Sequence, residues 1–138
     1  MSDAVGSRRE ARERALSLLY EADAKGTAPG EIVDEQELPP DEFAVDLVRG
    51  VGDHFDESDA LIRRFARGWA LERMPVIDRT LLRMAIFELA HRPDVPTAAI
   101  ISEAVEPAKR YSTDDSGRFV NGMLGRIAEE LRPQEERA

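Results

Sequence analysis

The sequence predicts an all-α protein with about seven helices in two packed helical bundles that form one domain over residues 1–138. Proline and glycine divide the chain into short blocks, and within these blocks apolar residues recur three and four positions apart, which is the helical period. No block alternates apolar and polar residues as a half-buried strand does. A chain of 138 residues with 42% hydrophobic residues suits a single domain with a core. The two bundles are expected at about residues 7–74 and 76–131.

The first helix is predicted over about residues 8–24. Ser7 followed by Glu10 fits a capping box, in which the two side chains satisfy free backbone amides at a helix start. Lys25-Gly26 is expected to end this helix, because glycine favours the position that follows a helix. The apolar face of this helix consists of Ala11, Ala15, Leu18, Leu19 and Ala22.

The middle of the chain predicts two helices and one ambiguous block. Residues 30–37 are acidic and weakly apolar, and they fit either one or two helical turns or a loop. Two prolines followed by Asp41-Glu42 predict a helix start, because acids suit the positive end of the helix dipole, and this helix stops near Gly52. The next helix is expected to begin near Asp56 and to bury apolar residues at helical spacing as far as Trp69.

The second half predicts three more helices. Residues 76–92 form the most apolar block, so this helix is expected at the centre of its bundle. The sixth helix starts at Thr97 and contains Pro107, which is expected to kink or shorten it. Asp115 or Ser116 is expected to cap the last helix. The apolar stripe of that helix comprises Phe119, Val120, Met123, Leu124, Ile127 and Leu131.

The sequence lacks the patterns that most catalytic and metal sites need. There is no cysteine, which removes thiolate chemistry and cysteine-ligated zinc. His54 and His91 lie in different helical blocks, so we expect no metal and no cofactor. Gly50-Val51-Gly52 lacks the third glycine of a nucleotide-binding loop and fits a helix stop. No acid pair stands out as general acid and base, so we expect no catalytic residue and no enzyme.

Charge and hydropathy restrict where the protein acts and what it binds. The polar residues 1–13 predict no signal peptide, and no stretch of about 18 apolar residues is present to span a membrane. Together with the lack of cysteine, this favours a cytoplasmic protein. The formal net charge of -9 disfavours general nucleic-acid binding, so any RNA site must be local. Residues 31–46 hold seven acids and no base.

A first candidate RNA site lies at the start of the first helix. Arg8, Arg9 and Arg12 fall on one flank of its apolar face, and Tyr20 lies further along the same flank. Guanidinium groups beside an exposed aromatic ring can hold phosphates and stack a base of single-stranded RNA. The alternative is a solvated helix end, in which the interleaved glutamates form ion pairs with these arginines.

A second candidate site surrounds the start of the last helix. Lys109 precedes a polar connector, and Asp115, Arg118 and Phe119 follow it. Free amides at a helix start, nearby cations and an aromatic ring form a corner that accepts anions. The alternative is structural: a helix end with favourable cations, a connector and a helix start, with Phe119 in the core.

An ordered set of motifs over roughly residues 7–131 resembles the NusB family. Each motif is short, but their order and the final Phe-Val-Asn-Gly element are specific. They are Arg8-Arg9-Glu10-Ala11-Arg12-Glu13 with Leu19-Tyr20, Asp78-Arg79, Leu81-Leu82-Arg83, Glu88-Leu89, Asp94-Val95-Pro96, Glu103-Ala104-Val105, Ala108-Lys109 and Phe119-Val120-Asn121-Gly122.

The resemblance implies a non-enzymatic factor in transcription antitermination. Family members pair with the ribosomal protein NusE, bind boxA RNA of ribosomal RNA leaders and act on elongating RNA polymerase. Some members are thought to self-associate, so the resemblance leaves monomer and homodimer open. Together with the two candidate sites, the resemblance gives an expected RNA-binding set of Arg8, Arg9, Arg12, Tyr20, Lys109, Asp115, Arg118 and Phe119. The residues expected to meet NusE are Tyr20, Asp78, Arg79 and Glu88.

Two other interpretations stay open. The chain can be the RNA-binding module of a ribosomal RNA methyltransferase, which shares this helical domain, although it has no room for a cofactor-binding α/β domain. It can also be a helical protein-interaction module without RNA binding. Three positions depart from the family pattern, namely Glu10, Ser102 and Pro107. Because Glu10 cancels positive charge where many relatives carry another base, we expect modest RNA affinity without the ribosomal partner.

Overall fold

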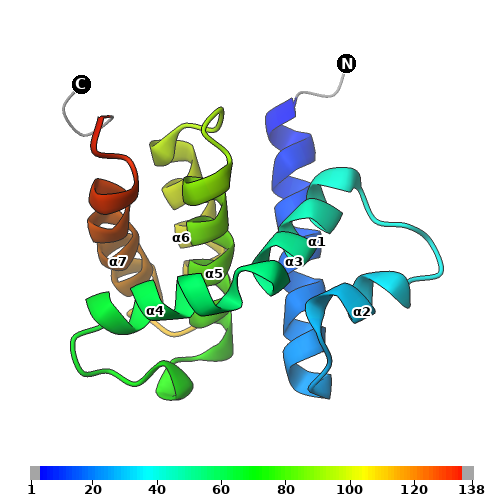
Figure 1. Cartoon of the computed structure of the whole chain (residues 1–138), viewed down its shortest axis with the longest axis horizontal. Coiled ribbons are helices and arrows are strands. Elements are labelled where there is room, and N and C mark those ends of the chain that lie inside the picture. The colour runs from blue at the N-terminus through cyan, green and yellow to red at the C-terminus, as the bar shows by residue number, and fades with distance from the viewer. Residues whose placement is uncertain (1–3, 135–138) are drawn as a thin grey trace. The chain divides into compact units, whose positions relative to one another are not determined.

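The structure is a computed structural model that describes residues 4–134, and these form seven α-helices and one short 3₁₀ helix (Figure 1). No strand occurs within that range, which confirms the all-α prediction. The chain divides into two compact units between His54 and Phe55. The helices are α1 (Ala4–Lys25), α2 (Pro29–Asp34), α3 (Glu42–Asp53), α4 (Phe55–Phe65), η1 (Leu71–Arg73), α5 (Val76–His91), α6 (Thr97–Tyr111) and α7 (Ser116–Leu131).

The first unit is a three-helix arrangement in which α1, α2 and α3 each pack against the other two. The ambiguous acidic block therefore contains a helix, α2. All five apolar positions predicted for the first helix are buried, and α1 ends at Lys25, where Gly26 takes a left-handed φ of 68° as a residue after a helix often does. The fully buried larger side chains of this unit are Leu18, Ile32, Leu47, Val48 and Val51.

The two predicted helix starts in this unit have different outcomes. Asp41 caps α3 as expected, since its Oδ1 accepts a hydrogen bond of 2.7 Å from the Phe43 N–H. The capping box at Ser7 is wrong, because α1 already begins at Ala4. The helix therefore extends on the N-terminal side of the expected start. The Ser7 side chain lies outside the part of the molecule that the structure describes.

The second unit is built around α5, α6 and α7, which pack against one another. Helix α4 packs against α5 and α7, so it belongs to this unit, whereas the sequence suggested a boundary near residues 74–76. Helix α6 continues through Pro107 to Tyr111 and is not shortened, because Ala104 and Ala108 on either side of the proline are both buried. Within residues 4–134, no helix has the length and apolar character needed to cross a membrane.

The end of α4 differs from the sequence prediction. The helix stops at Phe65 rather than continuing to Trp69, because Arg67 and Gly68 have left-handed φ angles of 52° and 91°. Glycine after a helix favours this conformation, and the apolar spacing of the segment masked that signal. Trp69 consequently lies in a turn with 41% of its surface exposed, and not on the buried face where we expected it.

Candidate nucleic-acid interface

The first unit carries three arginines near the start of α1, Arg8, Arg9 and Arg12, which we call the N-terminal arginine surface. The guanidinium carbons of Arg8 and Arg12 each lie 5.2 Å from the centroid of the Phe43 ring. A ring face attracts a cation but satisfies none of its N–H donors. The ring therefore holds two guanidinium groups beside one another, and Arg9 next to them is exposed.

Phe43 is the residue of this surface that sequence reasoning missed. In the structure this side chain of α3 is half-buried beneath the guanidinium groups of Arg8 and Arg12. Nothing in the local sequence links Phe43 to α1, since more than 30 residues separate Arg12 from Phe43. Arg14, in the same helix, points elsewhere, because its Nη2 donates to Gln36 Oε1 at 2.8 Å.

The second unit brings Lys109, Asp115, Arg118 and Phe119 together around the start of α7, and we call this group the α7 corner. The stem of Lys109 lies across Gly117: a Cβ at that glycine would come within 2.7 Å of Lys109 Cγ. The absent side chain thus lets the end of α6 approach the first turn of α7. Figure 1 shows these two helices side by side within the second unit.

The cations of the α7 corner form only weak, exposed ion pairs with acids. Arg118 Nη2 lies 3.1 Å from Asp115 Oδ1, and both side chains are more than four-fifths exposed. Lys109 Nζ lies 3.8 Å from a Glu106 oxygen, again at the surface. Exposed pairs of this kind contribute about 0–1 kcal/mol, so both cations can exchange their partners for a phosphate at little cost.

A buried polar network fixes the connector that leads into the corner. Asp78, at the start of α5, is 1% exposed and accepts hydrogen bonds from Ser112 Oγ at 2.5 Å and Ser116 Oγ at 2.8 Å. The Thr113 N–H donates to Ser116 Oγ at 3.1 Å. These bonds link the residue that follows α6, the connector and the first turn of α7 to one carboxylate. Asp78 therefore sets the position of the α7 corner.

The residues expected to meet a protein partner differ in how far they are exposed at the surface. Tyr20 is 48% exposed, and Arg79 is half-buried with its Nη1 donating to the Met74 carbonyl at 2.9 Å. Asp78 and Glu88 are 1% and 2% exposed. Direct contact between these two side chains and a partner stays a prediction. Their burial disfavours it, because neither side chain reaches the surface. Periodicity could not show this, because α5 is apolar on a wide face.

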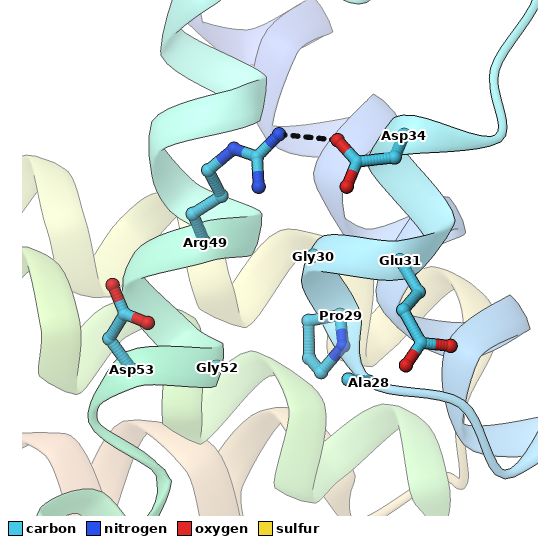
Figure 2. A pocket seen from close by; sticks show the side chains of 8 residues that line it. All are labelled: Ala28, Pro29, Gly30, Glu31, Asp34, Arg49, Gly52 and Asp53. Atoms are coloured by element: carbon cyan, nitrogen blue, oxygen red, sulfur yellow. Dashed lines mark hydrogen bonds and ion pairs between the residues drawn. The ribbon is translucent and has the colours of Figure 1, made fainter.

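A pocket in the first unit has the wrong charge for a phosphate. It lies between α2 and α3, and its polar side chains are Glu31, Asp34, Asp53 and Arg49 (Figure 2). The one cation is already paired, since Arg49 Nη2 lies 2.8 Å from Asp34 Oδ1. Three carboxylates against one engaged guanidinium repel an RNA backbone, so this pocket is not part of the candidate interface.

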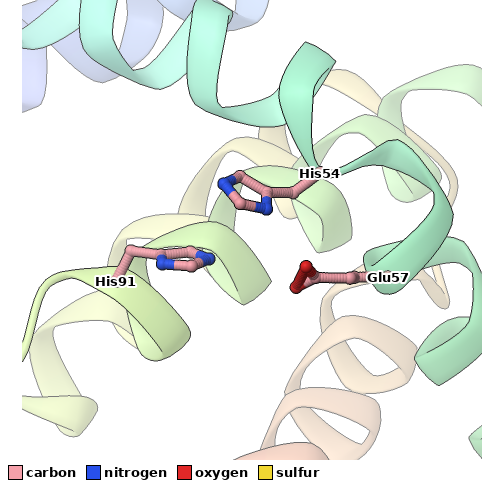
Figure 3. Close-up of side chains that lie close together, drawn as sticks. All are labelled: His54, Glu57 and His91. Carbon is pink, nitrogen blue, oxygen red and sulfur yellow. The ribbon is translucent and has the colours of Figure 1, made fainter.

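One pair of metal-ligating side chains comes together in the second unit. Glu57 of α4 and His91 at the end of α5 point toward one another with ligand atoms within 4.8 Å (Figure 3). The His91 ring also lies 5.2 Å from the Phe87 ring. His54, the other histidine of the sequence, follows α3 in the first unit. Within the second unit the pair thus offers one carboxylate and one imidazole as potential ligands.

Fold and surface together define an all-helical protein that presents arginines on an aromatic ring near the start of α1 and cations around the start of α7. A model of the NusB family matches residues 9–129 of the sequence. The chain belongs to the NusB family, which confirms the resemblance that its motifs carry.

Named relatives and solved structures agree with this membership. The chain is 50% identical to the transcription antitermination protein NusB of Salinispora tropica over 130 residues, which cover 89% of this chain and 96% of the relative. It is 48% identical to the protein of the same name from Symbiobacterium thermophilum, with 88% of each chain covered. Among solved structures, NusB of T. maritima is similar with a TM-score of 0.84 at 36% identity, covering 93% of this chain and 94% of that one.

A further solved structure contains binding partners. In a crystal structure of the antitermination factors NusB and NusE in complex with double-stranded RNA, the similar chain is 28% identical with a TM-score of 0.76. The match covers 89% of this chain and 96% of that one.

Proposed function

We propose that this protein is a transcription antitermination factor that binds boxA RNA together with the ribosomal protein NusE and acts on elongating RNA polymerase. Relatives at 50% and 48% identity over most of the chain carry the antitermination name. A similar chain is found in complex with NusE and RNA. The observation that carries the RNA-binding part is the pair Arg8 and Arg12, whose two positive charges are held together over one ring.

The proposed roles follow from exposure and charge. The N-terminal arginine surface and Tyr20 contact RNA, and the α7 corner supplies Lys109, Asp115, Arg118 and Phe119 for the same ligand. Tyr20 and Arg79 meet NusE directly, while Asp78 and Glu88 act from beneath the surface of α5. The protein acts in the cytoplasm as an adaptor without catalysing a reaction, since its role is to hold two partners together.

Neutralising Arg9 is expected to weaken boxA RNA binding and to flatten its salt dependence. Each phosphate contact to a single strand contributes about 0.7 to the slope of log K against log salt concentration, so Arg9→Gln lowers that slope by about 0.7. The matched control is Arg49→Gln, which removes the same charge from the acidic pocket outside the candidate interface. Fluorescence anisotropy at several salt concentrations measures both. Equal slopes for the two variants would favour a protein-interaction module without RNA binding.

The ribosomal partner is expected to strengthen RNA binding by this chain. With a net charge of -9 and Glu10 among the arginines, the isolated protein has a small local positive field, and a bound partner adds contacts to the same RNA. Titration of boxA RNA into the chain with and without NusE measures the difference, which we expect to exceed about 10-fold. Tight binding by the isolated chain, unchanged by NusE, would refute this expectation.

A further inference from the structure

The turn between α4 and η1 holds an exposed tryptophan in a strained backbone. Arg67 and Gly68 are both left-handed, with φ of 52° and 91°, and the Trp69 N–H donates to the Ala66 carbonyl at 3.3 Å. Glycine adopts this conformation freely, but for Arg67 it costs energy. Strain of this kind persists where the surrounding structure fixes it, and it is common at binding sites.

The Trp69 ring is held against the α7 corner. Its centroid lies 4.7 Å from that of Phe119, with an angle of 68° between the planes. In such an edge contact the edge of one ring points at the face of the other. The contact therefore leaves both faces of the first ring uncovered by its partner. Trp69 keeps 41% of its surface exposed and Phe119 is half-buried. Aromatic rings that are fixed in place and open on a face are what unpaired RNA bases stack on.

The segment around this turn is positively charged in a chain that is acidic overall. Residues 63–73 contain four arginines and one acid, whereas the whole chain has a net charge of -9. Arg67 and Arg73 are exposed, and within residues 4–134 neither has a carboxylate partner. Their charges are therefore available to a ligand beside Trp69.

The other two arginines of the segment already have acidic partners. Arg63 Nη2 lies 3.1 Å from Glu72 Oε1, and this hydrogen bond holds the pKa of Glu72 below its ordinary value. Arg64 pairs with Glu130 of α7. The nearby acids thus neutralise Arg63 and Arg64, and the remaining local field attracts an anion.

We propose that Trp69 is a base-stacking residue, which receives an unpaired RNA base beside Phe119 while Arg67 holds the neighbouring phosphate. The proposal rests on the RNA-binding function proposed above, because Phe119 belongs to the α7 corner. RNA fits this patch better than a protein does, since the ring is flanked by arginines without carboxylate partners rather than by other exposed apolar side chains. The RNA surface of the second unit accordingly extends from α7 onto the α4–η1 turn.

The first experiment measures the fluorescence of Trp69, which can be assigned directly because the sequence contains a single tryptophan. Single-stranded boxA RNA is titrated into the full chain while anisotropy of a labelled RNA reports binding and indole fluorescence reports stacking. A base stacked on Trp69 is expected to quench its emission with the same midpoint as the anisotropy change. Inorganic polyphosphate, which offers phosphates without bases, serves as the comparison and is expected to leave the emission nearly unchanged.

The second experiment separates stacking from charge. Trp69→Leu keeps an apolar contact to Phe119 but removes the aromatic face, and we expect about 5- to 100-fold weaker RNA binding with an unchanged salt slope. Trp69→Phe keeps a stacking face and is expected to retain most of the affinity. Arg67→Gln is expected to reduce the salt slope by about 0.7. Circular dichroism melting checks that each variant folds, and the quenching experiment needs no variant.

The outcomes distinguish this proposal from the general function. If the wild-type chain binds boxA RNA with unquenched Trp69 emission, and Trp69→Leu binds as tightly, the stacking role is overturned and RNA binding stands. If the wild-type chain binds no boxA RNA with or without NusE, both proposals fail. If Trp69→Leu weakens NusE binding in the absence of RNA and leaves RNA affinity unchanged, the ring docks a protein and the stacking role is again overturned.

Discussion

Replacing Arg132 with methionine is expected to lower the free energy of unfolding by about 3–5 kcal/mol. Arg132 follows α7 and is 8% exposed. Its guanidinium donates to backbone carbonyls at the end of α5 and in the turn that follows. The accepting oxygens belong to Glu88 at 3.2 Å, Leu89 at 3.0 Å, Arg92 at 2.7 Å and Val95 at 2.7 Å.

The magnitude follows from what the substitution leaves behind. The Glu88 and Arg92 carbonyls also accept from the Arg92 and Val95 N–H groups, but Arg132 is the donor to the carbonyls of Leu89 and Val95 in a buried place. Methionine fills much of the volume but donates nothing, and each buried carbonyl left without a donor costs about 1–3 kcal/mol. The cation also lies at the negative end of the α5 dipole, which stabilises it further.

Thermal melting monitored by circular dichroism measures the effect of Arg132→Met. For a chain of this size a loss of about 3–5 kcal/mol lowers Tm by roughly 10–20 °C. The matched control is Arg126→Met, the same change at an exposed position of α7, where we expect a shift within about 0.5 kcal/mol. Melting of the two variants at the same temperature would show that the carbonyls find other donors and that Arg132 does not hold the end of α5.

The helices were predictable from the sequence because local rules determine them. Apolar spacing predicted α3, α5 and α7 nearly to the residue, since each has a buried stripe. Asp41 caps α3 as expected, but the side chain of Asp115 makes no capping hydrogen bond at the start of α7, so that part of the prediction is wrong. Local rules failed where two local signals competed. At Trp69 the apolar spacing favoured a longer helix, and the backbone freedom of Gly68 ended it.

The candidate site was only partly predictable, because its geometry depends on pairs that are distant in the sequence. The arginines of α1 were identified from their pattern, but the ring that holds two of them, Phe43, comes from α3. Asp78 was expected at the surface because it matches a family motif, and its buried role depends on Ser112 and Ser116, more than 30 residues later. Burial and partner choice at such positions are tertiary properties that no single stretch of sequence encodes.

Replacing Asp78 with alanine is expected to lower both the stability of the second unit and the affinity for RNA. The substitution removes the acceptor of two short hydrogen bonds in a buried place, which costs about 2–3 kcal/mol. Without the carboxylate, the connector between α6 and α7 loses its tie to α5, and Lys109 and Phe119 lose their fixed spacing. We expect RNA affinity to fall about 5-fold, which corresponds to a coupling of about 1 kcal/mol.

The control separates lost stability from lost positioning. Asp59→Ala removes a largely buried carboxylate of the same unit, whose hydrogen bonds run to Arg83 and not to the connector, with Oδ1 2.8 Å from Arg83 Nε. Both variants are expected to melt earlier than the wild-type chain, and only Asp78→Ala is expected to bind boxA RNA more weakly at a temperature where both are folded. Asp78→Asn, which keeps one acceptor oxygen, should fall between Asp78→Ala and the wild-type chain in both measurements. If Asp59→Ala weakens RNA binding as much as Asp78→Ala does, the loss reflects general destabilisation, and Asp78 does not position the corner.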